Sequence, residues 1–189
     1  MTEDTDQQLV DRVLAGNKNA FNFLVVRYQH RVLALIRRFV NDPQEAEDVS
    51  QEAFIKAYRA LSLFRGDSAF YTWLYRIAVN TAKNYLVSRK RRPPANDVEV
   101  EEAEVSEIGT VLRQIENPES SLVTEKLKQV IDVAIAELPE DLRTAFTLRE
   151  FSGMSYEDIT EVMDCPVGTV RSRIFRAREA IDKKIRDVI

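Results

Sequence analysis

Residues 138–181 read LPEDLRTAFTLREFSGMSYEDITEVMDCPVGTVRSRIFRAREAI, and local signals divide this stretch into three helices. The first begins around the proline and is predicted to reach Glu150. Ser155 followed three residues later by Asp158 predicts the capped start of a second helix, with an acid where Glu or Gln is usual. Residues 164–166, Asp-Cys-Pro, predict a turn before a long basic helix. This arrangement is typical of a helix-turn-helix.

The third of these helices has an apolar face and a basic face. Apolar residues recur at helical spacing and predict its buried stripe: Val167, Val170, Ile174, Ala177, Ile181 and Ile185. The opposite face carries Gly168, Thr169, Ser172, Phe175, Arg176 and Glu179. Residues 166–189 have net charge +4, whereas residues 124–165 have net charge -6. Only this helix is basic, which gives the domain a predicted DNA-binding side.

In a helix-turn-helix the second helix of the motif places its N-terminal turns against base edges in the major groove. Thr169, Ser172 and Arg176 can hydrogen-bond to bases, and Phe175 can touch a thymine methyl group or the backbone. The flanking arginines are expected to hold phosphates and fix the register; they are Arg171, Arg173 and Arg178. The alternative is a packing helix with a basic outer face. The mid-face phenylalanine and the capped preceding helix favour DNA binding.

The composition of the whole chain excludes several function classes. The 189 residues include one Cys and one His, which excludes a disulfide framework and disfavours a His-based triad or a multi-His metal site. No cofactor is therefore expected. No apolar run approaches the roughly 20 residues needed to span a bilayer. The N-terminus, MTEDTDQQLV, is acidic and polar, unlike a signal peptide, so we expect a cytoplasmic protein without membrane insertion.

The net charge of -4 is unevenly distributed along the chain. Residues 1–92 have net charge +5, residues 93–123 have -7 and residues 124–189 have -2. The middle segment opens with two prolines, has no aromatic residue and clusters glutamates, so it predicts a flexible acidic linker. We therefore expect two domains, 1–92 and 124–189, with the linker 93–123 between them.

The first domain is predicted to be helical throughout. A short helix precedes Gly16, and an apolar stripe of period 3.6 spans residues 18–40. Asp42-Pro43 starts a third helix running to about Leu61, and a fourth is expected over about 68–89. No alternating strand pattern appears, so the fold class is all-α: two small helical domains joined by the acidic linker.

Residues 53–92 combine nine basic residues with one acid and hold eight of the chain's sixteen aromatic residues. Basic charge attracts phosphate, and aromatic rings accept unstacked bases, so the segment favours single-stranded nucleic acid. On the fourth helix, one stripe is expected in the core: Phe70, Leu74, Ile77, Thr81 and Tyr85. Another face is expected to meet nucleic acid: Arg76, Asn80, Lys83 and Val87, with Trp73 at its border. Phe64 and Tyr71 lie off the core stripe, which favours a functional role.

Glu45, Asp48 and Glu52 share one face of the third helix. A metal site there lacks a nearby His and a second acidic helix to complete its shell. A solvated face and a docking face for a partner remain open, because periodicity does not distinguish between them.

The stretches DVSQEAFIKAYRAL (48–61) and FRGDSAFYTWLYRIAVNTAKNYL (64–86), together with residues 138–181, resemble the extracytoplasmic-function sigma factors of bacterial RNA polymerase. The resemblance covers both domains and is strongest to the envelope-stress members. It implies a sigma region 2 helical bundle and a sigma region 4 helix-turn-helix, without regions 1 and 3. It also implies a non-enzymatic initiation factor that directs core polymerase to specific promoters. Such a factor reads the -35 element as a duplex and the -10 element as a melted single strand, in an envelope-stress response.

The resemblance assigns roles to particular residues. The docking face for the clamp helices of the largest polymerase subunit would be Asp48, Gln51, Glu52, Ile55 and Lys56. The -10 element would be captured around a flipped base, within the segment from Phe64 to Asn84, by Phe64, Ser68, Ala69, Tyr71, Trp73, Arg76, Asn80, Lys83 and Asn84. The -35 element would be contacted by the helix from Pro166 to Arg178, with a phosphate contact from Arg149. An anti-sigma factor, commonly membrane-anchored, would inhibit the protein, which is expected to be a monomer when alone.

Two other functions remain as alternatives. A conventional helix-turn-helix repressor or activator would bind duplex DNA by itself, usually as a dimer, and would not need the aromatic, basic first domain. A nuclease could use the carboxylates of residues 45–52, but the sequence offers no second acidic cluster. The first alternative is the stronger of the two.

Overall fold

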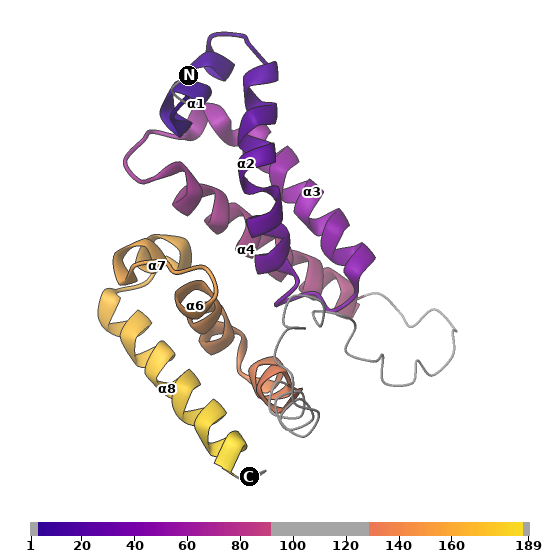
Figure 1. The fold of residues 1–189 in the computed structure, drawn as a ribbon, viewed down its shortest axis with the longest axis vertical. Coiled ribbons are helices and arrows are strands. Elements are labelled where there is room, and N and C mark those ends of the chain that lie inside the picture. Colours follow the sequence, from indigo (N-terminus) through magenta and orange to yellow (C-terminus); the bar gives the residue numbers. More distant parts are fainter. Residues whose placement is uncertain (1–3, 92–128, 187–189) are drawn as a thin grey trace, which may run out of the picture.

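The computed structural model describes residues 4–91 and 129–186, and every regular element within these two ranges is a helix (Figure 1). The predicted all-α class is therefore confirmed. The predicted linker, residues 93–123, lies outside the described residues. Within the two described ranges, no helix combines the length and the apolar character required to cross a bilayer.

The first range forms four α-helices. They are α1 (Asp6–Leu14), α2 (Asn19–Ile36), α3 (Pro43–Ala60) and α4 (Phe70–Arg91), with a 3-10 turn at Leu61–Leu63 between the last two. The Thr5 side chain and Gln8 form a reciprocal cap at the start of α1. The Asp42 carboxylate accepts a hydrogen bond from the Glu45 amide at 2.8 Å, so α3 begins where its N-cap and proline predicted.

Helices α2, α3 and α4 pack against one another and enclose the core of this half. Leu24, Ile36 and Leu74 are fully buried there. The core stripe predicted for α4 is confirmed at Phe70, Leu74 and Thr81, which are buried, while Ile77 and Tyr85 are half-buried. The buried side of α4 is wider than the predicted stripe, because Tyr75, Ala78, Val79 and Ala82 are buried as well.

The second range contains a helix over residues 129–137, then α6 (Glu140–Glu150), α7 (Tyr156–Met163) and α8 (Val167–Arg186). Ser155 and Asp158 form the predicted capping box at the start of α7. Asp164 ends α7 in the left-handed conformation, at φ 51°, and so turns the chain into α8. The helix-turn-helix predicted from local signals is therefore present.

The buried stripe of α8 is confirmed at Val170, Ile174, Ala177 and Ile181. The prediction was wrong for Val167, which is 38% exposed. Val167 is the first residue of α8, so its side chain lies beyond the packed surface of the neighbouring helices. The remaining member, Ile185, is half-buried.

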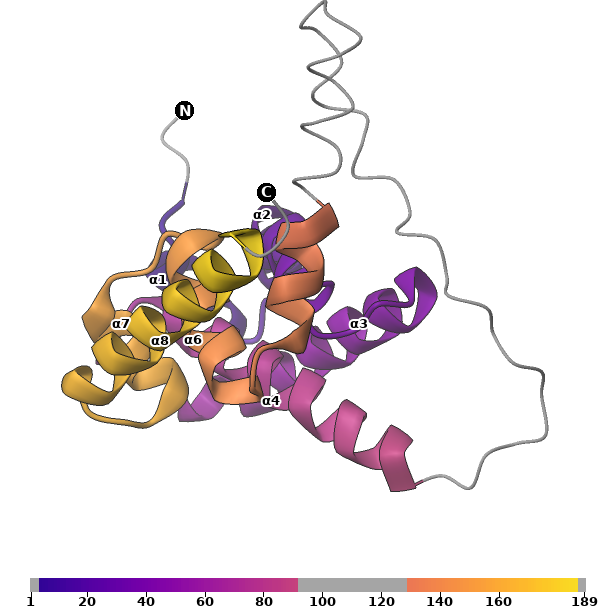
Figure 2. The ribbon, with the colours of Figure 1, turned by 90° about the horizontal axis from the view of Figure 1, so that it is seen from below.

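The two halves of the chain are in direct contact. Helix α7 packs against α4 (Figures 1 and 2). One apolar cluster runs from the first half through Leu148 and Ile159 of the second. A smaller cluster, including Ile135 and Ile181, joins the helix over 129–137 to α8. The sequence predicted two domains, but nothing in its local patterns predicted this contact.

Candidate nucleic-acid interface

An aromatic cluster lies where the loop before α4 meets the start of that helix. The Phe64 ring centroid lies 5.3 Å from that of Trp73 and 5.7 Å from that of Phe70, the latter pair edge to face. Phe70 is buried, whereas Phe64 and Trp73 are half-buried and form the rim. Gly66 adopts φ 77° in this loop, a left-handed conformation that favours glycine. Rings held in this way offer flat surfaces on which an unpaired base can stack.

A pocket of about 610 Å³ opens beside these rings. One wall comes from the loop over residues 63–68 together with Trp73 and Arg76. The other wall comes from the helix-turn-helix, through Thr160, Glu161 and residues 164–166. The predicted -10 residues Phe64 and Ser68 are therefore together at the pocket, and Ala69 lies exposed next to Ser68 in the loop.

The face of α4 predicted to meet nucleic acid is largely accessible. Arg76, Asn80 and Asn84 are exposed and follow one another at spacings of four residues, so they share one side of the helix. Lys83 differs, because its ammonium group lies 3.1 Å from a Glu140 carboxylate oxygen and 3.5 Å from one of Asp141. Both acids belong to α6 of the other half.

Tyr71 also contacts the second half of the chain. Its hydroxyl donates to Asp158 Oδ2 at 2.8 Å, and the hydroxyl of neighbouring Thr72 donates to Oδ1 at 2.9 Å. Burial, followed by the hydrogen bond to Asp158, raises the pKa of Tyr71. Burial alone would raise the pKa of Asp158, but hydrogen bonds from Ser155, Tyr71 and Thr72 outweigh it and lower the pKa. The Asp158 carboxylate is therefore held ionised at this contact.

The predicted docking face on α3 is exposed. Asp48, Gln51 and Glu52 are open to solvent, and Ile55 among them is 45% exposed. Lys56 is half-buried, and its ammonium group lies 3.6 Å from a Glu52 carboxylate oxygen. Within the described ranges, no group of three or more His, Cys, Asp and Glu residues is arranged to hold a metal ion. The face combines negative charge with an exposed apolar side chain, which suits a protein partner.

The outer face of α8 presents the residues predicted for base contact. Gly168, Ser172 and Arg176 are exposed, and Thr169 is half-buried. Phe175 is 61% exposed. Pro166 is exposed in the turn just before the helix. These side chains lie on the N-terminal and central turns of α8, where a major-groove helix makes its base contacts.

The arginines around α8 have different surroundings. The Arg149 and Arg171 guanidinium groups lie 4.8 Å and 5.4 Å from the Tyr156 ring centroid, and Arg149 also donates to the Met154 carbonyl oxygen at 2.7 Å. Arg178 pairs with Glu150, whose carboxylate raises the arginine pKa through its hydrogen bond. Within the described residues, Arg176 makes no ion pair and is exposed.

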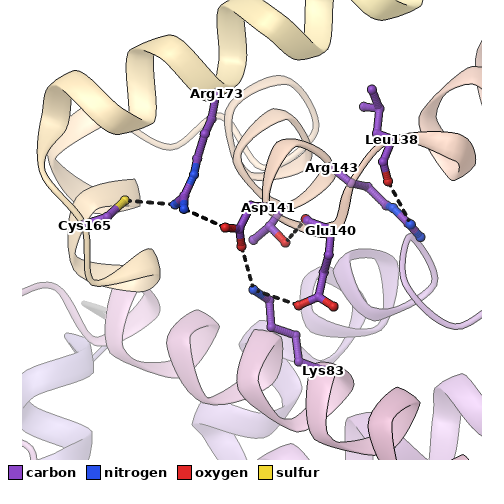
Figure 3. A network of polar contacts seen from close by, with 8 residues as sticks. Lys83, Leu138, Glu140, Asp141, Arg143, Cys165 and Arg173 are labelled. Atoms are coloured by element: carbon purple, nitrogen blue, oxygen red, sulfur yellow. Dashed lines mark hydrogen bonds and ion pairs between the residues drawn. The ribbon is translucent and has the colours of Figure 1, made fainter. Parts of the chain in front are cut away.

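Arg173 is held inside the molecule by two groups. Its guanidinium donates to Asp141 Oδ2 at 2.6 Å and to Cys165 Sγ at 3.3 Å (Figure 3). Asp141 thus contacts Lys83 of α4 and Arg173 of α8 at once, as Figure 3 shows. The contacts of Asp141 and the second role of Asp158 were not predicted from the sequence, because both residues act across a contact between distant parts of the chain.

Comparison with known proteins places both halves of the chain in described families. Sigma-70 region 2 matches residues 24–92, and Sigma-70, region 4, matches residues 128–181. The RNA polymerase sigma-H factor of Pseudomonas aeruginosa is 63% identical over 189 residues, which cover 100% of this chain and 98% of that protein. The ECF RNA polymerase sigma-E factor of Escherichia coli K12 is 63% identical over 185 residues, covering 98% and 96%.

Solved structures show the same fold. CnrH, solved in complex with the cytosolic domain of CnrY, has a TM-score of 0.67 and 25% identity, and the match covers 95% of this chain and 96% of that one. RpoE of Bartonella quintana, solved with the anti-sigma factor NepR, has a TM-score of 0.65 at 23% identity, covering 88% and 96%. The second likeness concerns the fold alone.

Proposed function

The chain belongs to the extracytoplasmic-function sigma factors of bacterial RNA polymerase, and on that premise we propose which of its surfaces contact the polymerase and which contact promoter DNA. A sigma factor binds core polymerase and directs it to specific promoters. This chain is such a transcription initiation factor, of the kind represented by the envelope-stress factor sigma-E. We assign residues 1–92 to polymerase binding and -10 recognition, residues 93–123 to the linker, and residues 124–189 to -35 recognition.

The -10 element binds as a single strand along the loop before α4 and the outer face of that helix. Phe64 and Trp73 form the rim of a pocket large enough for a base, and this observation carries the proposal. Ser68 and Ala69 line the approach, and Tyr71 lies beside it. Arg76 and Lys83 hold phosphates, while Asn80 and Asn84 offer both donors and acceptors to base edges.

The -35 element binds as a duplex against α8. Thr169, Ser172 and Arg176 face the base edges, and Phe175 packs on a thymine methyl group or the sugar. Pro166 and Gly168 lie at the N-terminal end of α8, the end that enters the major groove. The phosphate contacts come from Arg149, Arg171, Arg173 and Arg178. The Arg176 guanidinium is exposed and makes no ion pair with the residues that the structure describes, which supports its assignment to base recognition.

The exposed face of α3 docks on the clamp helices of the largest polymerase subunit. Asp48, Gln51, Glu52 and Lys56 supply polar contacts around the exposed Ile55, which supplies an apolar centre. The protein catalyses no reaction, because the polymerase makes the RNA. Stacking and phosphate contacts in the first half offset the free energy needed to separate the promoter strands.

The remaining partner is an anti-sigma factor that holds the protein inactive, and we propose that this factor is anchored in the membrane. CnrH was solved with the cytosolic domain of CnrY, and RpoE of Bartonella quintana with the anti-sigma factor NepR, which supports a similar interaction here. The protein acts in the cytoplasm, where its polymerase and promoter targets lie, and is a monomer before it binds them.

Run-off transcription with purified core polymerase tests the proposed function. We expect a promoter-specific transcript when this protein is added to core polymerase and a candidate promoter, and none with core polymerase alone. The protein should also bind that promoter more tightly with core polymerase than without it. Equal promoter binding in the absence of core, with no specific transcript, would favour the stand-alone helix-turn-helix alternative.

Replacing Asn80 with alanine is expected to weaken -10 selectivity by about fivefold, the effect of losing one base hydrogen bond. The fold should be unaffected, because Asn80 is exposed. The measurement is permanganate reactivity of opened thymines on promoters with intact and substituted -10 elements. Asn22→Ala, an exposed asparagine of α2, is the matched control. Undiminished selectivity in the Asn80 variant would remove this residue from the -10 surface.

A further inference from the structure

Asp141 at the start of α6 contacts one residue from each of the two proposed DNA-binding helices. Its Oδ1 lies 3.5 Å from the Lys83 ammonium group of α4, and its Oδ2 accepts from Arg173 of α8 at 2.6 Å (Figure 3). Glu140 adds a second carboxylate 3.1 Å from Lys83. A carboxylate pairs with each of these basic side chains through the same kind of charge-assisted hydrogen bond that a DNA phosphate would make.

The rest of the contact between the halves covers the same surfaces. Asp158 binds the hydroxyls of Tyr71 and Thr72, and the helix-turn-helix closes one wall of the aromatic pocket. Glu161 and Asp164 of that wall are acidic, whereas Arg65 and Arg76 of the opposite wall are basic. The second half therefore covers part of the proposed -10 surface, where carboxylates bind Lys83, Tyr71 and Thr72.

We propose that this contact is an autoinhibitory clamp, in which Asp141 takes the role of DNA phosphate by pairing with Lys83 across the two halves and with Arg173 inside the second half. Lys83 cannot hold a -10 phosphate while it is paired with α6, and a strand cannot lie along Tyr71 while Asp158 binds its hydroxyl. The inference rests on the proposed function, because it takes α4 and α8 as the DNA-binding helices. The protein without polymerase is then closed and binds DNA weakly, and it opens when its halves are separated.

The strength of the clamp is suited to a switch. The pairs of Asp141 are partly exposed, with side-chain exposures of 51% for Asp141, 25% for Lys83 and 23% for Arg173. Exposed pairs are individually weak, so docking on a partner surface can overcome them. The apparent affinity for DNA is proportional to the fraction of molecules that are open. A variant that raises the open fraction therefore raises the apparent DNA affinity by the same factor.

The test replaces Asp141 with asparagine in the full chain and measures two quantities. The first is binding of a fluorescein-labelled random-sequence single strand, followed by anisotropy. The second is access to Cys165, the chain's one cysteine, which lines the pocket between the halves. Access is the rate of reaction with a maleimide carrying a polyethylene-glycol chain, divided by the rate with iodoacetamide. The ratio cancels any change in the intrinsic reactivity of the thiol caused by its contact with Arg173.

Asp182→Asn is the matched control. Asp182 is an exposed carboxylate on α8 that pairs with Arg186 four residues along, so the change in charge is the same but no contact between the halves is lost. We expect Asp141→Asn to raise both the access ratio and the single-strand affinity by about fivefold. The control should change either by less than about twofold.

Three results would overturn the clamp. An unchanged access ratio would mean that Asp141 does not hold the halves together. A raised ratio with unaltered affinity would mean that closure does not mask the DNA contacts. An equal rise in single-strand affinity in Asp182→Asn would mean that the effect comes from the change in net charge and not from the contact between the halves. Failure of the proposed function is recognised separately, because it appears as absent promoter-specific transcription by the unsubstituted protein with core polymerase.

Discussion

Replacing Arg176 with alanine is expected to reduce transcription from a promoter with an intact -35 element by roughly 5- to 150-fold, the loss of about 1–3 kcal/mol carried by a good base contact. Arg176 is exposed on the central turns of α8 and makes no ion pair within the described residues, so the folded protein does not depend on it. Run-off transcription measures the loss, and a promoter with a scrambled -35 element should lose little further activity in the variant.

Arg186→Ala is the control for this variant. Arg186 lies on the same helix in its last turn, far from the N-terminal turns that face the groove, and its side chain is 77% exposed. The control should keep its activity, and both variants should bind core polymerase normally. Loss of polymerase binding in Arg176→Ala would show that this face of α8 serves the polymerase rather than the promoter.

Replacing Leu74 with alanine is expected to lower the free energy of unfolding by about 2–5 kcal/mol. Leu74 is 0% exposed in the middle of the core that α4 forms with α2 and α3. The substitution removes buried methyl groups and leaves a cavity that the surrounding helices cannot close completely. Urea unfolding of the full chain, followed by far-ultraviolet circular dichroism, measures the change.

Leu63→Ala makes the same chemical change at a position that is 73% exposed. It should alter the free energy of unfolding by no more than about 0.5 kcal/mol. If Leu74→Ala lowered the free energy of unfolding no more than the control does, Leu74 would not be packed in a core between α4, α2 and α3. Because α4 also supports the aromatic pocket, the Leu74 variant should lose promoter opening as the temperature approaches its lowered midpoint.

The sequence predicted those features that depend on neighbouring residues. The capping box of Ser155 and Asp158 and the N-cap of Asp42 are complete within four residues, so short patterns were sufficient. The buried stripe of α8 was predicted for the same reason, because helical spacing alone defines it. Val167 was the exception, since its exposure depends on where the neighbouring helices end.

The contact between the halves could not be predicted from local patterns. Asp158 and Tyr71 are 87 residues apart, and Asp141 and Lys83 are 58 apart. A surface carboxylate and a partly exposed lysine give no signal in the sequence that they will meet. Lys83 and Arg173 were predicted as phosphate ligands from their charge, and the structure shows both of them paired with acids of α6.

Asp158 also bears on how proteins of this kind can change over generations. Its carboxylate accepts hydrogen bonds from the Ser155 amide and hydroxyl at the start of α7, and also from two hydroxyls on the opposite half. Selection for a looser or tighter closure cannot act on this position without disturbing the start of α7. Changes that adjust closure are therefore easier at a position such as Glu140, whose carboxylate pairs with Lys83, and position 158 should tolerate few alternatives.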